Sequence, residues 1–434
     1  MLPTYTSIFV KLLNIAALLC LLAAFVCFTS PTVETEIPQF LLMWSTACNN
    51  NVVVDLAKEL AKDVPSKGNY LDDYVEYCKL SGVIQLPSTY FNVYSSKEGE
   101  NKPNVLRIAN CAIDNSNWRC LLLASCTVGS TIDSIVTHNL SLNPQHITDL
   151  IAAVEKIGQL TSLILEHISM NEVFFSTERS EEVPYNYRDE TIALQDSLLG
   201  LFSNNNFQIQ YLSLKGNKLG DNFVTKLQPL LVSNLAIYSL NLCDNFLTKT
   251  GVLALFTALR LNPYIKSLSI AKNLLDYTAG TGESSELVSS LAMLYTGSIA
   301  STDDENHFKN IAKLITDRNK AIKEVNKKRK KANQNEFAEL VTPDNRVFKV
   351  DGSNVLVNKG VDNIDLSYTK FVSNKDAIME LLDTFEKKAS TVTSVVGSMN
   401  LLFCVKGSTV DQTIVDKINS IQDIQGPTIT LITE

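Results

Sequence analysis

This 434-residue chain has few histidines and lacks the short motifs that are typical of catalytic and metal sites. It has four histidines, and its nine cysteines include no C-x-x-C pair, so neither a close-spaced zinc motif nor a dense disulfide framework is indicated. No G-x-S-x-G turn occurs, and Gly280-Thr281-Gly282 lacks the lysine and the spacing of a phosphate-binding loop. His138 and His167 are interpreted as surface histidines of strands rather than as metal ligands. We therefore expect no enzyme activity, no cofactor and no metal ion.

Basic residues are too few for a nucleic-acid-binding protein. The 38 lysines and arginines are outnumbered by 46 aspartates and glutamates, which gives a net charge of −8. Phosphate binding requires a basic surface, so no nucleic-acid partner is expected. The run Lys327–Lys331 is an exception that could be a nuclear address, an RNA or phosphoinositide patch, or a membrane contact. We favour a solvated face near the end of a helix, where the helix dipole stabilises cations.

Charge is scarcest near the N-terminus, where Lys11 is the only charged side chain before Glu34. Residues Leu12 to Phe28 form a run of 17 residues that is apolar apart from Asn14. This run is slightly longer than the core of a signal peptide and slightly shorter than a spanning helix. We expect residues 1–30 to be a signal peptide or a membrane anchor, with membrane contact through residues 8–30 and a secreted or membrane-anchored location. A buried N-terminal helix is the alternative, but the run has no polar face to present to water.

The most informative feature of the chain is a repeated segment of the form L-x-L-x-x-N-x-L. It occurs as LSLKGNKL, LNLCDNFL and LSIAKNLL, and Asn217, Asn245 and Asn273 of these segments are 28 residues apart. The alternating apolar residues predict a short strand with one buried face, and the apolar residues at helical spacing that follow predict a helix. One such unit cannot bury its own apolar edge, so the units are expected to stack. The sequence therefore predicts an α/β repeat fold.

The motif and its period resemble those of ribonuclease-inhibitor-type leucine-rich repeats. The resemblance implies a horseshoe-shaped solenoid with parallel strands on the concave face and helices on the convex face. It also implies a ladder of buried side chains that bond the turns of neighbouring repeats, at Cys111, Asn217, Asn245, Asn273 and Thr369. Cysteine is an accepted substitute at this position, whereas Leu140 and Ile168 are not. We therefore expect the ladder to be broken in these two repeats.

The register of the repeats predicts the organisation of the chain. Residues 31–104 are expected to form an N-terminal cap with one helix at Val52–Lys62, and residues 105–300 the main solenoid, with the polar run Ser176–Glu190 as an inserted loop. Residues 301–345 are expected to form a charged, basic helix insertion. This insertion would separate the solenoid from the C-terminal repeats and cap of residues 346–434, whose strands include VDNIDLSYTKF, SMNLLFCVKGS and PTITLIT.

The concave face is where we expect a protein partner to bind, unless this face is simply solvated. The candidate residues lie between the buried leucines of neighbouring strands: Glu166, His167, Tyr211, Lys215, Asn241, Asp244 and Lys272. The chain is thus interpreted as a non-enzymatic leucine-rich-repeat scaffold. Two alternatives stay open. One is a host-directed effector of an intracellular bacterium that acts in the cytoplasm, which a composition rich in lysine and asparagine suggests. The other is a regulatory subunit or enzyme with its activity in residues 301–434.

Overall fold

The computed structural model describes residues 54–62, 64–96, 103–157, 160–168, 173–174, 186–187, 189–203, 209–276, 282–331, 336–342, 347–350, 352–356, 361–392, 400–405, 411–423 and 428–433. Within these ranges, no helix combines the length and the apolar character needed to cross a membrane. The predicted signal or anchor segment, residues 1–30, lies outside the described residues.

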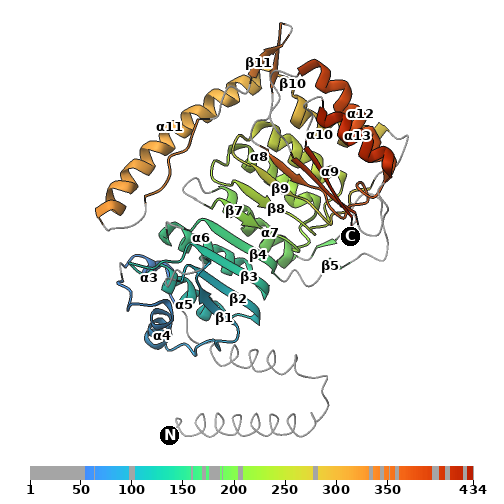
Figure 1. Cartoon of the computed structure of the whole chain (residues 1–434). Coiled ribbons are helices and arrows are strands. Elements are labelled where there is room, and N and C mark those ends of the chain that lie inside the picture. Colours follow the sequence, from blue (N-terminus) through green and yellow to red (C-terminus); the bar gives the residue numbers. More distant parts are fainter. Residues whose placement is uncertain are drawn as a thin grey trace, which may run out of the picture.

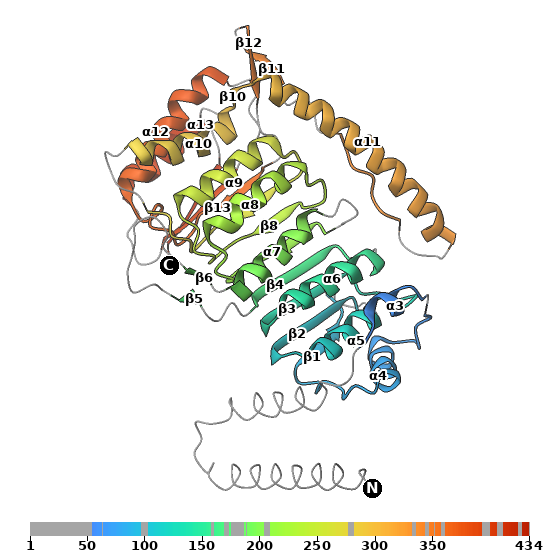
Figure 2. The same ribbon diagram turned by 180° about the vertical axis from the view of Figure 1, so that it is seen from behind.

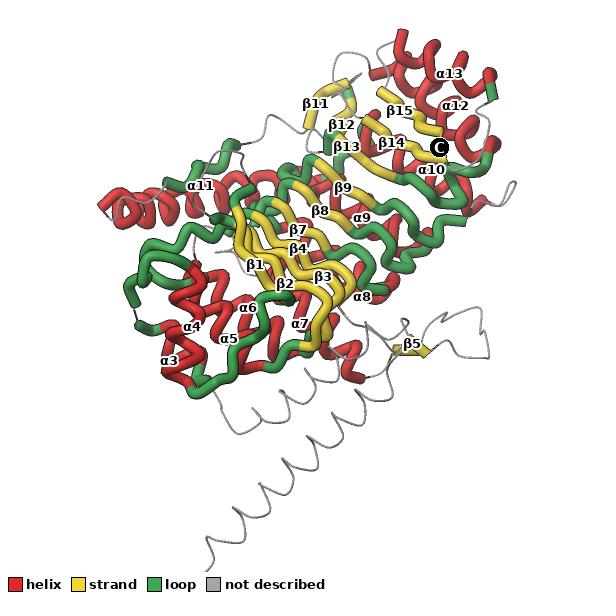
Figure 3. The backbone as a smooth tube through the Cα atoms, turned by 60° about the horizontal axis from the view of Figure 1, so that its bottom comes forward, coloured by secondary structure: helices red, strands yellow, loops and turns green. Residues whose placement is uncertain are grey.

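A ten-stranded sheet runs through the described part of the chain (Figure 3). Its first two strands are antiparallel, and every other neighbouring pair is parallel. In spatial order the strands are β1 (Phe91–Tyr94), β2 (Val105–Ala112), β3 (Ser134–Ser141), β4 (Ser162–Ile168), β7 (Tyr211–Ser213), β8 (Ser239–Asn241), β9 (Ser267–Ser269), β13 (Asn363–Asp365), β14 (Asn400–Val405) and β15 (Thr428–Thr433).

One apolar residue of each parallel strand lies in a continuous row across this sheet. The row pairs each residue with the next, in the order Leu106, Ile135, Leu163, Leu212, Leu240, Leu268, Ile364, Leu401 and Ile429. A shift of one residue in any strand would turn its apolar side chains to the opposite face of the sheet. The alternating leucines therefore fix the register in every repeat.

The helices that follow the strands pack on one face of the sheet (Figures 1 and 2). They are α5 (Asn115–Ser125), α6 (Pro144–Ile157), α7 (Asp189–Ser203), α8 (Gly220–Ser233), α9 (Lys249–Leu261), α10 (Gly282–Thr296), α12 (Lys375–Val392) and α13 (Gln412–Asp423). The predicted α/β fold with alternating strands and helices is thus confirmed. The opposite face of the sheet is called the open face below.

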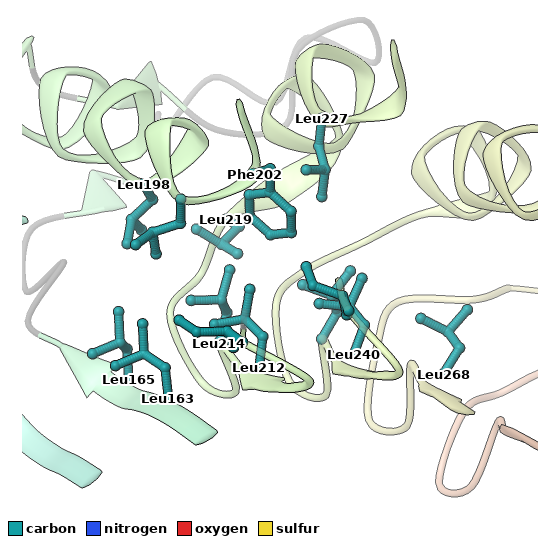
Figure 4. Close-up of a cluster of buried hydrophobic side chains, with 14 of the residues drawn as sticks. Leu163, Leu165, Leu198, Phe202, Leu212, Leu214, Leu219, Leu227, Leu240 and Leu268 are labelled. Atoms are coloured by element: carbon teal, nitrogen blue, oxygen red, sulfur yellow. The ribbon is translucent and has the colours of Figure 1, made fainter. Parts of the chain in front are cut away.

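The core lies between the strands and these helices (Figure 4). Leu212 and Leu214, which come from β7 and the turn after it, are buried together with Phe202 of α7 and Leu227 of α8. Burying a side chain of this kind contributes roughly 1.5–3 kcal/mol. The same layer continues along the whole stack, so no single repeat has a core of its own.

Residues 31–53 of the expected cap lie outside the described residues, and the part from residue 54 onward contains more helix than predicted. The helix expected at Val52–Lys62 is a five-residue helix, α3 (Leu56–Leu60), and a longer helix, α4 (Tyr70–Ser81), was not predicted. The buried Tyr74 hydroxyl donates to Asn117 Oδ1 of α5 at 2.8 Å and accepts from the Leu86 amide at 2.7 Å. Hydrogen bonds of this kind satisfy the polar end of a buried tyrosine, so the aromatic residues of α4 fix it against the first repeat.

A separate unit leaves the repeat stack between α10 and β13. It contains β10 (Ser298–Ile299), the 30-residue helix α11 (Thr302–Lys331), β11 (Val347–Val350) and β12 (Ser353–Leu356). The three strands form a small antiparallel sheet of their own. Sequence reasoning placed this unit between two blocks of repeats, but β13 pairs directly with β9, so the main sheet continues past it.

A smaller insertion follows β4. Two short antiparallel strands, β5 (Val173–Phe174) and β6 (Asn186–Tyr187), pair with each other in a two-stranded sheet of their own. The inserted loop was predicted at Ser176–Glu190, but its last two residues are the first turn of α7. Residues 175–185 of this loop lie outside the described residues.

Candidate functional site

Three buried asparagines connect the turns of successive repeats. The amide N–H of Asn217 donates to Asn245 Oδ1 at 3.0 Å, and that of Asn245 donates to Asn273 Oδ1 at 2.9 Å. Each side-chain Nδ2 in turn donates to backbone carbonyls, as Asn245 does to Leu214 at 3.0 Å and to Cys243 at 3.1 Å. A buried amide with both ends paired holds backbone groups that would otherwise be unsatisfied. We call these three residues the asparagine ladder.

The neighbouring ladder positions are also buried, and they differ in chemistry. Ile168 has no polar side chain, but its backbone N–H donates to Asn217 Oδ1 at 2.9 Å, so the ladder reaches one repeat further than its asparagines. Thr369 is 1% exposed, and its hydroxyl donates to the Leu366 carbonyl at 2.8 Å within its own repeat. Cys111 and Leu140 are paired across β2 and β3 and are buried.

A second pair of asparagines, which were not among the predicted ladder residues, links the other ends of the repeats. Asn234 and Asn262 follow α8 and α9, and both are buried. The Asn262 side chain donates to the carbonyls of Leu231 and Asn234 at 2.6 and 2.8 Å, and its Oδ1 accepts from the Ile265 amide at 3.0 Å. Their spacing of 28 residues is the sequence signal that could have identified them.

A row of left-handed residues lies next to the ladder. Just before the ladder position, every repeat from β2 to β13 has a residue with positive φ: Asn110, Asn139, His167, Gly216, Asp244, Lys272 and Tyr368. Four of these residues donate their backbone N–H to a backbone carbonyl of the next repeat at 2.9–3.0 Å. The pairs are His167 with Lys215, Gly216 with Cys243, Asp244 with Ala271, and Lys272 with Ser367. Only some residue types tolerate this conformation readily. These hydrogen bonds thus fix the backbone at the candidate residues His167, Asp244 and Lys272.

The predicted partner-binding residues all lie at the open face or at its edge. Glu166 and His167 belong to β4, Tyr211 to β7 and Asn241 to β8. Lys215, Asp244 and Lys272 lie in the turns rather than on strands, because β7, β8 and β9 are only three residues long. Tyr211 is 49% exposed, and none of the seven is buried.

Hydrogen bonds and ring contacts join several of these side chains across the repeats. Ser213 donates to Glu166 Oε1 at 2.7 Å, and the Lys272 Nζ lies 5.4 Å from the ring centroid of Tyr368. The Asn241 side chain accepts from the Cys243 amide at 3.0 Å within its own turn. Such contacts orient side chains of the open face and leave them partly exposed to solvent.

Lys215 and Asp244 differ from these residues. Both are half-exposed, and neither forms an ion pair with any residue that the structure describes. They lie close enough to Cys243 to act on its thiol: burial raises the pKa of Cys243, and Lys215 partly offsets this while Asp244 adds to it. A thiol with a raised pKa is a weak nucleophile at neutral pH. The middle of the open face therefore offers charges of both signs, and the thiol of Cys243 is not activated.

The two histidines at this face are in contact with each other. The rings of His138 and His167 meet edge to face, with centroids 5.2 Å apart, and His138 Nδ1 is 4.0 Å from Glu166 Oε2. Among the described residues, no group of three or more histidine, cysteine, aspartate or glutamate side chains is placed to hold a metal ion. Among the described residues, Cys78, Cys111, Cys120, Cys126 and Cys243 are free thiols.

No known protein family and no curated protein matches this chain. Among solved structures, it is similar to the actin-binding site 2 of leiomodin-1, with 20% sequence identity over 32% of this chain and 80% of that chain, at a TM-score of 0.20. A similarity with so low a TM-score supports no conclusion about function, which is therefore argued from the residues of this chain.

Proposed function

We propose that this chain is a ribonuclease-inhibitor-type leucine-rich-repeat protein that binds a protein partner on the open face of its sheet, without catalysis. In this proposal the open face is the concave face of a horseshoe, and the helices form the convex face. The 28-residue motif, the parallel register and the bonding of the asparagine ladder support the repeat type. A rigid face spanning many repeats is the surface that repeat proteins use for binding.

The charges of Lys215 and Asp244, which form no ion pair within the described part of the chain, are the observation that supports the proposed binding face. Lysines on the helical side are paired within the protein instead: Lys226 with Asp196 at 2.6 Å, and Lys249 with Glu286 at 3.2 Å. Charges that have no internal partner can pair with a binding protein and steer its approach. Lys215 and Asp244 are therefore available to pair with a partner, whereas Lys226 and Lys249 are already paired within the protein.

The size of a protein interface extends the proposed site over several repeats. A standard interface buries about 800 Å² on each partner, and neighbouring strands are only about 5 Å apart. A partner must therefore cover β4, β7, β8 and β9 together. Glu166, Tyr211, Lys215, Asp244 and Lys272 fall within such a footprint.

Site-specific photo-crosslinking tests the proposal. A photo-reactive phenylalanine analogue replaces Tyr211 on the open face or Lys226 on the helical face, and the crosslinked protein is identified by mass spectrometry. We expect the Tyr211 position to capture a discrete partner. Reversing the charges of Glu166, Lys215, Asp244 and Lys272 together should abolish that crosslink, since none of the four is buried.

Charge reversal of Lys226 and Lys249 is the matched control and should leave capture at position 211 intact. Loss of the partner in this control, with retention in the open-face variant, would place the binding surface on the helices. Circular dichroism of both variants checks that the fold is kept.

We further propose that residues 1–30 direct the chain to export or hold it at a membrane, because their sequence is almost free of charge. Fractionation of cells that express a C-terminally tagged chain, followed by N-terminal sequencing, tests this. Cleavage near residue 29 indicates export, and retention of the intact chain in membranes indicates an anchor. An intact chain in the soluble fraction would contradict both.

A further inference from the structure

An extended segment runs back along the outer half of α11. This segment, residues 336–342, is called the strap. Two asparagines of α11 each form a pair of hydrogen bonds with one residue of it. Asn326 donates to the Phe337 carbonyl and accepts from the Phe337 amide, both at 2.8 Å. Asn319 does the same with Leu340, again at 2.8 Å in both directions.

The spacing of the two asparagines matches the spacing of an extended peptide. Seven residues of an α-helix rise about 10.5 Å, and three residues of an extended chain span about 10 Å. Asn319 and Asn326 are seven residues apart, and their partners Phe337 and Leu340 are three apart. The side-chain amides of Asn319 and Asn326 are therefore spaced to match a bound extended segment. Each side-chain amide pairs with the N–H and the carbonyl of one residue of that segment.

The same face of α11 is shaped for apolar side chains. Ile315 and Ile322 are 1% and 4% exposed and lie on the stripe of the asparagines, whereas most other residues of the outer half are exposed. Phe337 and Leu340 are the half-buried residues of the strap, and its other residues are exposed. Lys323 Nζ is 3.3 Å from Glu339 Oε2, which adds a preference for an acidic residue before the second apolar one.

The helix is fixed to the repeat stack without the strap. At its base, Arg260 of α9 donates to both carboxylate oxygens of Asp304, at 3.0 and 3.1 Å, and a His307 ring nitrogen lies 3.2 Å from the Leu261 carbonyl. The strap is joined to the repeats by a 2.9 Å hydrogen bond from the Tyr264 hydroxyl to the Val341 carbonyl. Removing the strap should therefore expose the face of α11 that carries Asn319 and Asn326 and leave α11 in place.

We propose that this face of α11 is a binding site for an extended peptide, and that the strap is its occupant in cis. The site takes a segment with apolar residues three apart and an acidic residue before the second, as in Phe337-Ala338-Glu339-Leu340. Four of its hydrogen bonds reach only main-chain atoms, so they are available to any peptide of suitable shape. A tethered strap competes at an effective concentration on the order of millimolar and keeps the site closed to weaker ligands.

A synthetic peptide with the sequence of residues 336–342, capped at both ends and carrying a fluorescent label, is the probe. The double variant Phe337→Pro/Leu340→Pro removes the two strap N–H groups that donate to Asn326 and Asn319, and it changes nothing in α11. By fluorescence anisotropy, this opened protein should bind the peptide at least about tenfold more tightly than the unmodified chain, because the competing strap is released. A peptide N-methylated at its Phe and Leu amides should not bind.

Adding Asn319→Leu and Asn326→Leu to the opened protein should abolish binding. Equal binding with and without these asparagines would overturn the proposal, as would no binding by an opened protein whose helical circular dichroism is unchanged. If the prolines unfold α11, Glu339→Lys opens the strap by repulsion from Lys323, and the same titration then decides. The outcome is independent of whether a partner binds the open face.

Discussion

The imidazole of His167 occupies the space beside Gly216 in the next repeat. A β-carbon built on Gly216 would clash with the imidazole ring of His167, and the φ of Gly216 is +72°. The two residues are neighbours in the left-handed row, and the His167 amide donates to the carbonyl of Lys215 at 3.0 Å. Glycine at position 216 therefore allows both the left-handed turn and the placement of a histidine on the open face.

Substitution of Gly216 should reveal this relationship as an energetic coupling. Gly216→Ala is expected to destabilise the protein through its positive φ, which costs about 1–2 kcal/mol, and through the clash with His167. In a His167→Ala background only the first cost remains. A double-mutant cycle from urea unfolding should give a coupling of roughly 1–2 kcal/mol. Identical effects in the two backgrounds would mean that the histidine moves away freely.

Loss of one ladder asparagine should weaken the whole stack. Asn245→Leu removes the acceptor of the Asn217 amide and both donors to backbone carbonyls, all at buried positions. Each buried group left unpaired costs about 1–3 kcal/mol, so the thermal midpoint should fall markedly. Asn241→Ser, at a half-exposed position of β8, is the control and should have a small effect. An unchanged midpoint for Asn245→Leu would contradict the structural role of the ladder.

Stability should depend on pH through His146. Burial lowers the pKa of this histidine to about 4, although Asp149 and Asp114 act in the opposite direction. Its Nδ1 accepts from the Asn143 amide at 3.0 Å, so the neutral form carries its proton on Nε2. Because the unfolded chain has a pKa near 6.5 at this residue, it binds a proton that the folded protein does not, and stability falls as the pH drops from about 6.5 towards 4.

The expected loss between pH 7 and pH 4.5 is about 2–3 kcal/mol from this residue. Urea unfolding at the two pH values, compared with His146→Gln, measures it, since glutamine has no proton to take up in this range. A variant with the same pH dependence as the original protein would show that His146 titrates normally in the fold.

The basic end of α11 should be dispensable for stability. Lys327 forms an ion pair with Glu324 of the same helix, and both side chains are about 70% exposed (68% and 70%). Exposed pairs of this kind contribute little, so replacing Lys327 to Lys331 with glutamines should change the free energy of unfolding by less than about 0.5 kcal/mol. Arg260→Gln is the contrasting variant, because it breaks the paired contact with the 9%-exposed Asp304 at the base of α11. A large loss from the glutamine variant would indicate that the basic run packs on an acidic surface.

The sequence by itself determined the repeating part of the fold. A period of 28 residues with alternating leucines specifies a strand and a helix per unit, and units with unburied apolar edges must stack. The row from Leu106 to Ile429 follows this local pattern, including the weakly matching segments near the C-terminus. Asn217, Asn245 and Asn273 were identifiable for the same reason, because their chemistry recurs at one position of the repeat.

Features made by residues far apart in the chain were decided only by the tertiary structure. The 28-residue pattern does not specify the position of α11. The pairing of β13 with β9, which are separated in the chain by the unit that contains α11, could therefore not be predicted from the pattern. The contact of His167 with Gly216 spans a long insertion, and the aromatic core of α4 depends on Asn117 and Leu121 of another helix. Likewise, nothing in the sequence distinguishes Asn319 and Asn326 from ordinary surface residues of a helix. Their role follows from the strap that packs along them in the structure. Periodic burial is a local property of sequence, whereas the pairing of single polar groups depends on which segments the fold brings together.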